Sequence, residues 1–226
     1  MLLRGDFHIH STASDGSLRP WEVVRTASNR GVGIIAITDH NTTNGINEAV
    51  ASGREYGVSV VPALELSTRY MGESIHLLAY FKDTNFCHPT FQKILIFIKA
   101  HKVKEARNIL CNFIYSDSLG DNLSIFEGIS FLKFFGAAVV LAHPIRISKK
   151  YISEILSLPF DGIEAKYCGS SFEDTNYYVN TALSRFPFYT GGSDFHSFQG
   201  RCSIGEPYLD ELELQTFLQN SGVLVL

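Results

Sequence analysis

The chain has 226 residues, a hydrophobic content of 45% and a formal net charge of −4 at pH 7. This length predicts one domain with a sizeable core. The acidic balance argues against an extended nucleic acid as partner, although a nucleotide-sized substrate needs only local positive charge. The longest apolar run, residues 94–98, is far too short to span a bilayer, and the N-terminus lacks the three regions of a secretion signal. We therefore expect a cytoplasmic protein with no membrane partner.

Four cysteines are spread along the chain without a C-x-x-C motif: Cys87, Cys111, Cys168 and Cys202. In a cytoplasmic protein such isolated residues are typical of reduced thiols. We predict neither a disulfide nor a cysteine-ligated zinc site.

Short apolar segments alternate along the chain with longer segments whose apolar residues recur at helical spacing. Strands are expected at about residues 1–9, 32–38, 58–66, 74–81, 137–142, 162–166 and 188–192, and the run 223–226 also resembles a strand. Helices are expected at about residues 20–29, 45–56, 89–115, 124–135, 148–158, 171–186 and 209–219. The alternation predicts an α/β fold with a parallel sheet, open or closed into a barrel. The segment 82–135 is long and mostly helical, so we expect it to form a small helical layer.

The first expected strand ends in two histidines one residue apart, His8 and His10. Side chains alternate along a strand, so both rings are expected on the same face. Two neighbouring imidazoles are a natural pair of metal ligands. Asp15 follows after a turn rich in Ser, Thr and Gly, close enough along the chain to point a carboxylate at the same place.

Each of the seven expected strands carries a His, Asp or Glu within it or directly after it. In chain order these residues are His8, His10, Asp39, His40, Glu65, His76, His143, Glu164, Asp194 and His196. Barrel enzymes assemble their active sites at the C-terminal ends of their strands, and one shared site explains this pattern better than seven separate structural roles. The two histidines outside the set, His88 and His101, fall in expected helix or loop and are assigned no site role.

Four carboxylates, including Asp15 and Glu164, and six histidines exceed the ligand capacity of one ion. Mixed nitrogen and oxygen ligation without cysteine suits Mn²⁺, Fe or Zn²⁺ and disfavours Ca²⁺. We therefore predict two or three divalent metal ions that share a bridging carboxylate. Such clusters lower the pKa of a bridging water and clamp the oxygens of a phosphate.

The ligand pattern resembles the four motifs of the PHP (polymerase and histidinol phosphatase) family. The residues that carry the resemblance are His8-Ile9-His10, Asp15, Thr38-Asp39-His40, Glu65, His76, His143-Pro144 and Ser193-Asp194-Phe195-His196. Members of that family have a distorted (β/α)₇ TIM-like barrel with metal ligands at the C-terminal ends of the strands. The resemblance implies that residues 1–226 form a single PHP domain of this kind, with residues 82–135 as a shortened helical insertion.

The resemblance also implies three metal positions. His8, His10, Glu65 and Asp194 would hold the first metal, Asp15, His40 and His196 the second, and Glu65, His76 and His143 the third. Asp39 and Glu164 lie beside the ligands, and Asp39 is expected to orient a histidine. The residues expected to act in catalysis are Asp39, Asp194 and His196.

Within that family, the chain is most similar to the small nucleotide-phosphatase branch. The segments that carry this similarity are S-T-A-S-D-G-S, I-T-D-H-N-T, H-L-L-A-Y-F and G-I-E. Those proteins remove a phosphate from nucleoside 3′,5′-bisphosphates or trim short RNA 5′ ends. The segment 82–135 is shorter than the helical insertion of that branch, so the substrate pocket need not be the same.

The predicted function is hydrolysis of a small phosphomonoester by a hydroxide that bridges two metals, with a nucleotide such as a 3′,5′-bisphosphate as one candidate substrate. Phosphate also needs basic side chains near the strand ends, and the candidates are Arg146, Arg201 and, more weakly, Lys166. Three alternatives stay open: a phosphatase of the histidinol-phosphate type, an amidohydrolase-like C–N hydrolase, and a non-catalytic metal-binding module. An amidohydrolase site would want a metal-bridging lysine, for which Lys166 is the candidate. The sequence leaves the substrate, the native metal and the oligomeric state open.

Overall fold

The computed structural model describes residues 3–116, 118 and 120–226, and within these residues the strands form two sheets. The first sheet is parallel and has the order β1 (Gly5–Ile9), β2 (Ile34–Ile37) and β3 (Ser59–Val60). The second has the order β4 (Ala63–Tyr70), β5 (Glu73–Phe81), β6 (Ala137–Leu141), β7 (Gly162–Tyr167) and β8 (Phe188–Gly192).

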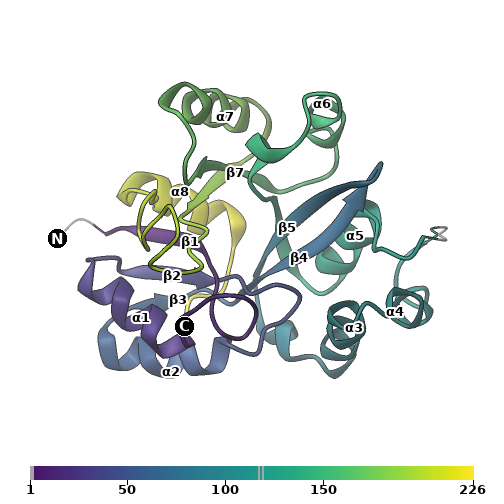
Figure 1. Ribbon diagram of the computed structural model, residues 1–226, viewed down its shortest axis with the longest axis horizontal. Coiled ribbons are helices and arrows are strands. Elements are labelled where there is room, and N and C mark those ends of the chain that lie inside the picture. Colours follow the sequence, from purple (N-terminus) through teal and green to yellow (C-terminus); the bar gives the residue numbers. More distant parts are fainter. Residues whose placement is uncertain (1–2, 117, 119) are drawn as a thin grey trace.

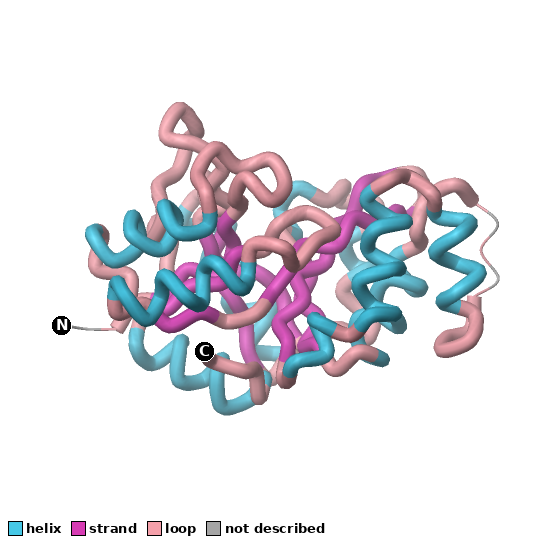
Figure 2. The backbone as a smooth tube through the Cα atoms, turned by 90° about the horizontal axis from the view of Figure 1, so that it is seen from below, coloured by secondary structure: helices cyan, strands magenta, loops and turns pink. Residues whose placement is uncertain are grey.

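Helices surround the strands, as the tube view shows most clearly (Figure 2). They are α1 (Pro20–Asn29), α2 (Ile46–Tyr56), α3 (Pro89–Lys99), α4 (Val103–Leu110), α5 (Ile125–Phe134), α6 (Ile152–Ile155), α7 (Phe172–Arg185) and α8 (Glu211–Ser221), with short 3₁₀ helices η1 (Thr84–Cys87) and η2 (Pro144–Arg146). In Figure 1, α1 and α2 flank the first sheet, while α3, α4 and α5 lie beyond β4 and β5. The expected α/β class is therefore confirmed.

The two sheets meet along two seams, where backbone contacts join them. At one seam Ile9 bridges Phe195, the Asp194 N–H donates to the His8 carbonyl at 2.8 Å and the His10 N–H donates to the Phe195 carbonyl at 2.9 Å. At the other seam His40 bridges Glu65. Both seams lie at residues of the expected metal site, so the ends of the two sheets meet there.

The prediction of a parallel sheet is correct for most strand pairs. It is wrong for β5, which runs antiparallel to β4 and β6. The reason is the two-residue turn Met71-Gly72, whose φ angles of 48° and 88° suit a tight hairpin and leave no room for a crossover helix. His76 therefore lies near the start of its strand, paired with Ser67, and not at a C-terminal end. It reaches the same edge as the other ligands because its strand runs in the opposite direction.

Several element boundaries also differ from expectation. The expected strand 58–66 is divided into β3 and β4 around Pro62, which has no N–H to donate to a ladder. The expected helix 89–115 is divided into α3 and α4 at His101, which has a φ of 56°. The expected helix 148–158 shortens to α6, and residues 223–226 form no strand, although Leu226 exchanges two backbone hydrogen bonds with Val60.

The expectation of four reduced cysteines is wrong. Cys168 and Cys202 form a disulfide, with their Cα atoms 6.1 Å apart, while Cys87 and Cys111 are free and exposed. The two bonded residues are 34 positions apart in the sequence, so no local spacing predicts the bond and only the fold brings them within disulfide range. Across the described ranges, no helix has the length and apolar character needed to cross a membrane.

Candidate metal centre

The structure brings all nine residues predicted as metal ligands together. Three groups have ligand atoms within 4.8 Å of one another: His8, His10, Glu65 and Asp194; His10, Asp15, His40 and His196; and His40, Glu65 and His76. The remaining residue, His143, has its Nε2 3.1 Å from Glu65 Oε1. The first group coincides with the expected first metal position, and the other two overlap the expected second and third.

The carboxylate of Glu65 lies at the centre of the cluster. Its oxygens lie between 2.8 and 3.3 Å from ring nitrogens of five residues, namely His8, His10, His40, His76 and His143. Glu65 is buried, and burial opposes its charge. The attraction of His8 and the hydrogen bonds from other rings outweigh burial and hold the pKa of Glu65 well below its usual range. A charged carboxylate in this position has the geometry of a bridging ligand.

Some buried ring nitrogens of the cluster have no hydrogen-bond partner among the described residues: both nitrogens of His10 and the Nδ1 of His40. The Nε2 of His10 lies 3.1 Å from Glu65 Oε2 and 3.1 Å from Asp194 Oδ1, yet the geometry forms a hydrogen bond with neither. Buried polar atoms in folded proteins are normally paired. Nitrogen and carboxylate ligands that converge without pairing therefore fit divalent cations placed between them.

Glu164 positions two ligands from beneath the cluster. One oxygen lies 2.9 Å from His8 Nδ1, and the other accepts a hydrogen bond of 2.8 Å from the backbone N–H of His143. Glu164 is a residue of β7 and is only 1% exposed. This contact turns the Nε2 of His8 toward Glu65, which is the usual function of a carboxylate behind a metal-binding histidine.

Asp39 does not orient a histidine, contrary to expectation. One oxygen accepts hydrogen bonds from the Ser11 N–H at 2.8 Å and the Ser14 hydroxyl at 2.6 Å, and the other accepts from the Ser11 hydroxyl at 2.6 Å. The expectation failed because Asp39 points toward the loop after β1, whose serines compete for it. The carboxylate instead holds the loop that carries Asp15.

Left-handed backbone occurs at two of the ligand positions. His143 has a φ of 29° and Asp194 a φ of 49°, a region that non-glycine residues rarely adopt. The turn at Asp194 is held by Asp6, which sequence reasoning did not single out. Asp6 is fully buried and accepts hydrogen bonds from the backbone N–H groups of Ser193 and Gly205, and burial raises its pKa to about 6.

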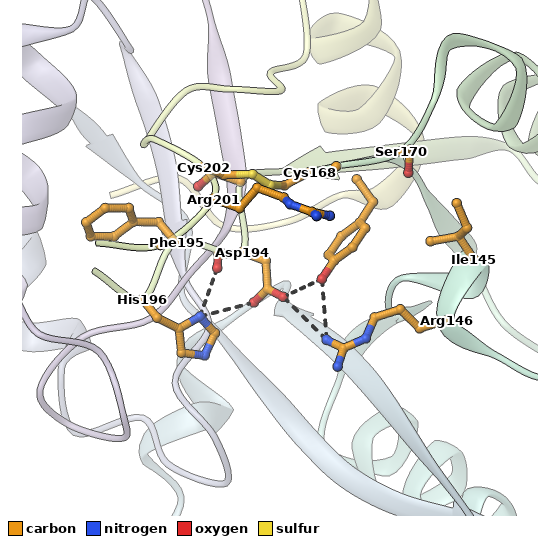
Figure 3. Close-up of a pocket in the computed structure, with 13 residues that line it drawn as sticks. Ile145, Arg146, Cys168, Ser170, Asp194, Phe195, His196, Arg201 and Cys202 are labelled. Carbon is orange, nitrogen blue, oxygen red and sulfur yellow. Dashed lines mark hydrogen bonds and ion pairs between the residues drawn. A yellow bond between two sulfur atoms is a disulfide. The ribbon is translucent and has the colours of Figure 1, made fainter. Parts of the chain in front are cut away.

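A cavity of about 430 Å³ opens beside the cluster, between the loops that follow β7 and β8 (Figure 3). Arg146 and Arg201 both line it, together with Asp194 and His196. The side chain of Arg146 is well exposed, and its Nη1 lies 3.9 Å from Asp194 Oδ2. Two guanidinium groups next to the expected metal ligands make this cavity suited to an anion.

Tyr167, a second residue that sequence reasoning missed, lies between Arg146 and Asp194. Its hydroxyl donates a hydrogen bond of 2.8 Å to Asp194 Oδ2, and Arg146 Nη1 lies 3.4 Å from the same hydroxyl. Burial and the charge of Asp194 raise the pKa of Tyr167 to about 12, so the phenol is neutral at physiological pH. The only available signal was a tyrosine at a strand end, three residues after Glu164.

Lys166 takes no part in this cavity as the structure describes it. Its ammonium pairs with Glu213 of α8, at 2.5 Å. The expected roles of Lys166 as a phosphate ligand and as a metal-bridging lysine therefore find no geometric support. His88, which was assigned no site role, caps α3 by accepting a hydrogen bond from the Thr90 N–H.

Residues 6–111 match the family model of the PHP domain. The resemblance of this chain to the PHP family is therefore confirmed over this segment, which is a little under half of the chain. The matched segment holds the first six expected ligands of the cluster, from His8 to His76, so the family resemblance and the geometry agree on this part of the site.

Curated relatives of this chain include nucleic-acid and nucleotide hydrolases. A 5′-3′ exoribonuclease of Haemophilus influenzae is 38% identical over 109 residues, which are 48% of this chain and 39% of the relative. A 3′,5′-nucleoside bisphosphate phosphatase of Chromobacterium violaceum is 31% identical over 104 residues, which are 46% of this chain and 36% of the relative. The matches thus span less than two fifths of the length of either relative.

Solved structures resemble this chain over most of its length. A protein from Bifidobacterium adolescentis assigned as a metal-dependent phosphoesterase has a TM-score of 0.76 at 21% identity and covers 96% of each chain. An amidohydrolase from Chromobacterium violaceum, solved with bound sulfate and no metal, has a TM-score of 0.73 at 20% identity and covers 88% of this chain and 89% of its own. At these identities the likeness shows a shared fold.

Proposed function

We propose that this protein is a PHP-type, metal-dependent phosphoesterase that hydrolyses a small phosphomonoester. The observation that carries the proposal is the cluster of nine converging ligands with two arginines in the adjoining cavity. A phosphate ester presents dianionic oxygens, and it needs both cations and guanidinium donors to be bound and cleaved. The proposed cofactors are two or three divalent ions, with Mn, Fe or Zn as candidates. We further propose that the strands correspond to a distorted seven-stranded barrel and that the protein acts in the cytoplasm.

Divalent ions held by the cluster would activate water and neutralise charge on the phosphoryl oxygens. Side chains of the protein would bind the phosphoryl group and orient the metal ligands. Arg146 and Arg201 would hold the phosphoryl oxygens in the cavity, and Tyr167 would keep Asp194 oriented through the hydrogen bond that its hydroxyl donates to Oδ2. His196 is partly exposed with its Nε2 3.3 Å from Asp15 Oδ2, so these two side chains would hold a metal ion at the edge of the cavity.

A nucleotide such as a 3′,5′-bisphosphate is the first candidate substrate, because one relative carries that activity in its name. A second candidate function is cleavage of phosphodiesters at RNA 5′ ends. It is favoured by the name of the Haemophilus influenzae relative, a 5′-3′ exoribonuclease. A histidinol-phosphate-type phosphatase remains a third candidate from the sequence. C–N hydrolysis is less favoured, despite one structural neighbour called an amidohydrolase, because Lys166 is paired with Glu213.

The test is a panel of phosphate esters assayed with Mn²⁺, Fe²⁺ or Zn²⁺. It includes p-nitrophenyl phosphate, AMP, histidinol phosphate, nucleoside 3′,5′-bisphosphates, a 5′-phosphorylated short RNA, and an amide and a lactone as controls. We expect phosphate release from at least one monoester, its loss in Asp194→Asn, and its retention in the surface variant Lys93→Met. Hydrolysis confined to the RNA would favour the diesterase reading. No release from any ester, with metal bound, would favour a non-catalytic module.

A further inference from the structure

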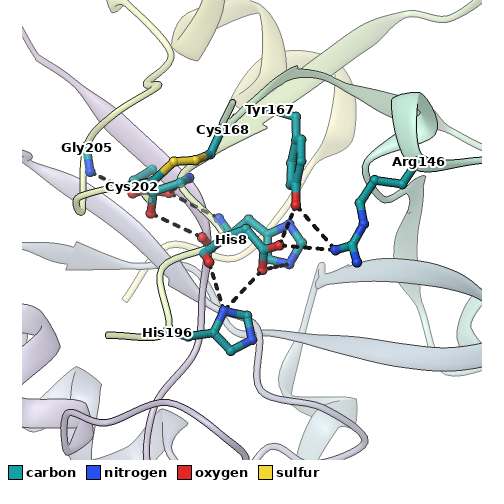
Figure 4. Close-up of a disulfide and its surroundings, with 10 residues drawn as sticks. His8, Arg146, Tyr167, Cys168, His196, Cys202 and Gly205 are labelled. Atoms are coloured by element: carbon teal, nitrogen blue, oxygen red, sulfur yellow. Dashed lines mark hydrogen bonds and ion pairs between the residues drawn. A yellow bond between two sulfur atoms is a disulfide. The ribbon is translucent and has the colours of Figure 1, made fainter. Parts of the chain in front are cut away.

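The disulfide joins two of the loops that line the cavity, those that follow β7 and β8. Cys168 directly follows Tyr167 at the end of β7, and Cys202 lies six residues after the predicted metal ligand His196. Both cysteines line the cavity, and Figure 4 shows the bond spanning the two loops above His8 and His196. Neither cysteine is among the ligand atoms that converge on Glu65.

Arg201 is held between the two ends of this bond. It precedes Cys202 in the chain, and its side chain lies against Gly169, the residue after Cys168. A Cβ atom added at Gly169 would come within 3.2 Å of both Cδ and Nη1 of Arg201. Gly169 has a φ of 77°, which glycine adopts without strain. The Arg201 side chain therefore passes close to the Gly169 backbone, next to the disulfide, and lies among the residues that line the cavity (Figure 3).

Few other contacts hold the segment that carries Arg201. Residues 198–201 are exposed, and Phe198 is 68% exposed. Within the described chain, Arg201 makes no hydrogen bond or ion pair with another residue, whereas Arg146 lies near both Tyr167 and Asp194. An exposed segment with few tertiary contacts is free to reorient once a covalent constraint is removed.

The metal cluster is anchored independently of the disulfide. The Asp194 N–H donates to the His8 carbonyl at 2.8 Å, and the Ser193 N–H donates to Asp6 at 3.0 Å. The carbonyl of His196 accepts from the Ser17 N–H at 2.7 Å. These bonds tie both ligands to β1 and to the loop after it, so opening the disulfide leaves them in place.

We propose that the Cys168–Cys202 disulfide is a redox-sensitive positioning element that holds Arg201 in the anion-binding cavity, so that its reduction weakens phosphate binding without dismantling the metal cluster. The proposal rests on the proposed phosphoesterase function for the identity of the anion. In reduction by a trialkylphosphine, phosphorus attacks one sulfur and the S–S bond breaks. The departing thiolate takes a proton, and water then converts the phosphorus adduct to a phosphine oxide and the second thiol.

Binding of inorganic phosphate to the Mn²⁺-loaded protein tests this without relying on turnover. The protein is first oxidised with glutathione disulfide, and thiols are counted by alkylation and mass spectrometry before and after phosphine treatment. We expect two alkylated cysteines before reduction, Cys87 and Cys111, and four after it. We expect the Kd for phosphate to rise about tenfold on reduction, the scale of one charge-assisted hydrogen bond, with unchanged bound Mn²⁺ and reversal on reoxidation.

Matched variants separate the disulfide from other effects of the reductant. The double variant Cys168→Ser/Cys202→Ser should bind phosphate as weakly as the reduced protein, and phosphine treatment should not change its affinity. In the double variant Cys87→Ser/Cys111→Ser, phosphine treatment should lower the affinity for phosphate as it does in the wild type. Arg201→Met should bind weakly in both redox states. If a substrate is found, reduction should raise KM more than it lowers kcat.

Four thiols in the oxidised protein, equal phosphate affinity in both redox states, or loss of Mn²⁺ on reduction would each overturn the proposal. Failure of the proposed phosphoesterase function gives a different result. In that case no ester is hydrolysed in either redox state, while the titration still measures whether reduction of the disulfide raises the Kd for phosphate.

Discussion

Glu164 fixes the ring of His8 from behind: its Oε1 lies 2.9 Å from His8 Nδ1, deep in the protein. This contact leaves only the Nε2 of His8 free to face Glu65, at 3.2 Å. The same carboxylate holds the backbone N–H of His143, which has left-handed geometry. One buried group therefore contacts two predicted ligands that are far apart in the sequence, one on β1 and one in the turn after β6.

The Glu164→Gln variant should lower the affinity of the protein for Mn²⁺ by about 10- to 100-fold, the usual effect of losing a carboxylate behind a ligating histidine. Calorimetric titration of the metal-free protein with Mn²⁺ measures this. Glu213→Gln is the matched control, because Glu213 pairs with Lys166 away from the cluster. Unchanged affinity in Glu164→Gln would contradict the positioning role.

The Asp39→Asn variant should loosen the loop that carries Asp15. The new amide nitrogen cannot accept from Ser11 or Ser14, so buried donors lose a partner and the free energy of unfolding should fall by about 1–3 kcal/mol. Urea unfolding measures the loss. Metal titration should show one weakened site with the others retained, because Asp15 belongs to one ligand group. Equal weakening of every site would show instead that Asp39 supports the whole cluster.

The Arg146→Met variant should raise the KM for the best phosphate ester about tenfold, because a guanidinium that contacts the anion is lost while the methylene chain is largely kept. Lys166→Met serves as the comparison, since its ammonium is paired with Glu213, and its KM should stay near that of the wild type. Steady-state kinetics of both variants decide the point. A larger change in Lys166→Met would restore the sequence-based assignment of that lysine to substrate binding.

Asp6 should make the stability of the fold depend on pH in a defined window. Burial raises its folded-state pKa from 3.8 to about 6, so the folded protein binds a proton more tightly than the unfolded chain does. The contribution of Asp6 to the free energy of unfolding is therefore fully present below about pH 4 and is lost as the pH rises through about 6. The total loss is about 3 kcal/mol.

The measurement for Asp6 is the free energy of unfolding from pH 4 to pH 8 in the wild type and in Asp6→Asn. The variant is expected to be less stable overall, because an amide nitrogen cannot accept from the Gly205 N–H. The informative quantity is the slope, because the decline between pH 4 and pH 6 should be shallower in Asp6→Asn. Parallel curves for the two proteins would show that Asp6 is ionised in the fold throughout this range.

The sequence by itself determined the fold class and the candidate ligand residues. Short apolar segments followed by His, Asp or Glu are local patterns, because strand periodicity and side-chain chemistry are both readable within a few residues. His8 and His10 are the clearest case, since alternation along one strand places both rings on one face. The role of each ligand toward a particular metal stays a prediction.

The tertiary structure decided what depends on partners distant in the sequence. A two-residue hairpin turns β5 around and delivers His76 to the shared edge from the start of its strand. Asp39 pairs with serines of the loop after β1, Lys166 pairs with Glu213, and Cys168 meets Cys202 across 34 positions. Each of these side chains had more than one chemically reasonable partner along the chain. Only the packing of strands and loops selects the partner, because hydrogen bonds, ion pairs and disulfides require close approach in space, whatever the separation in sequence.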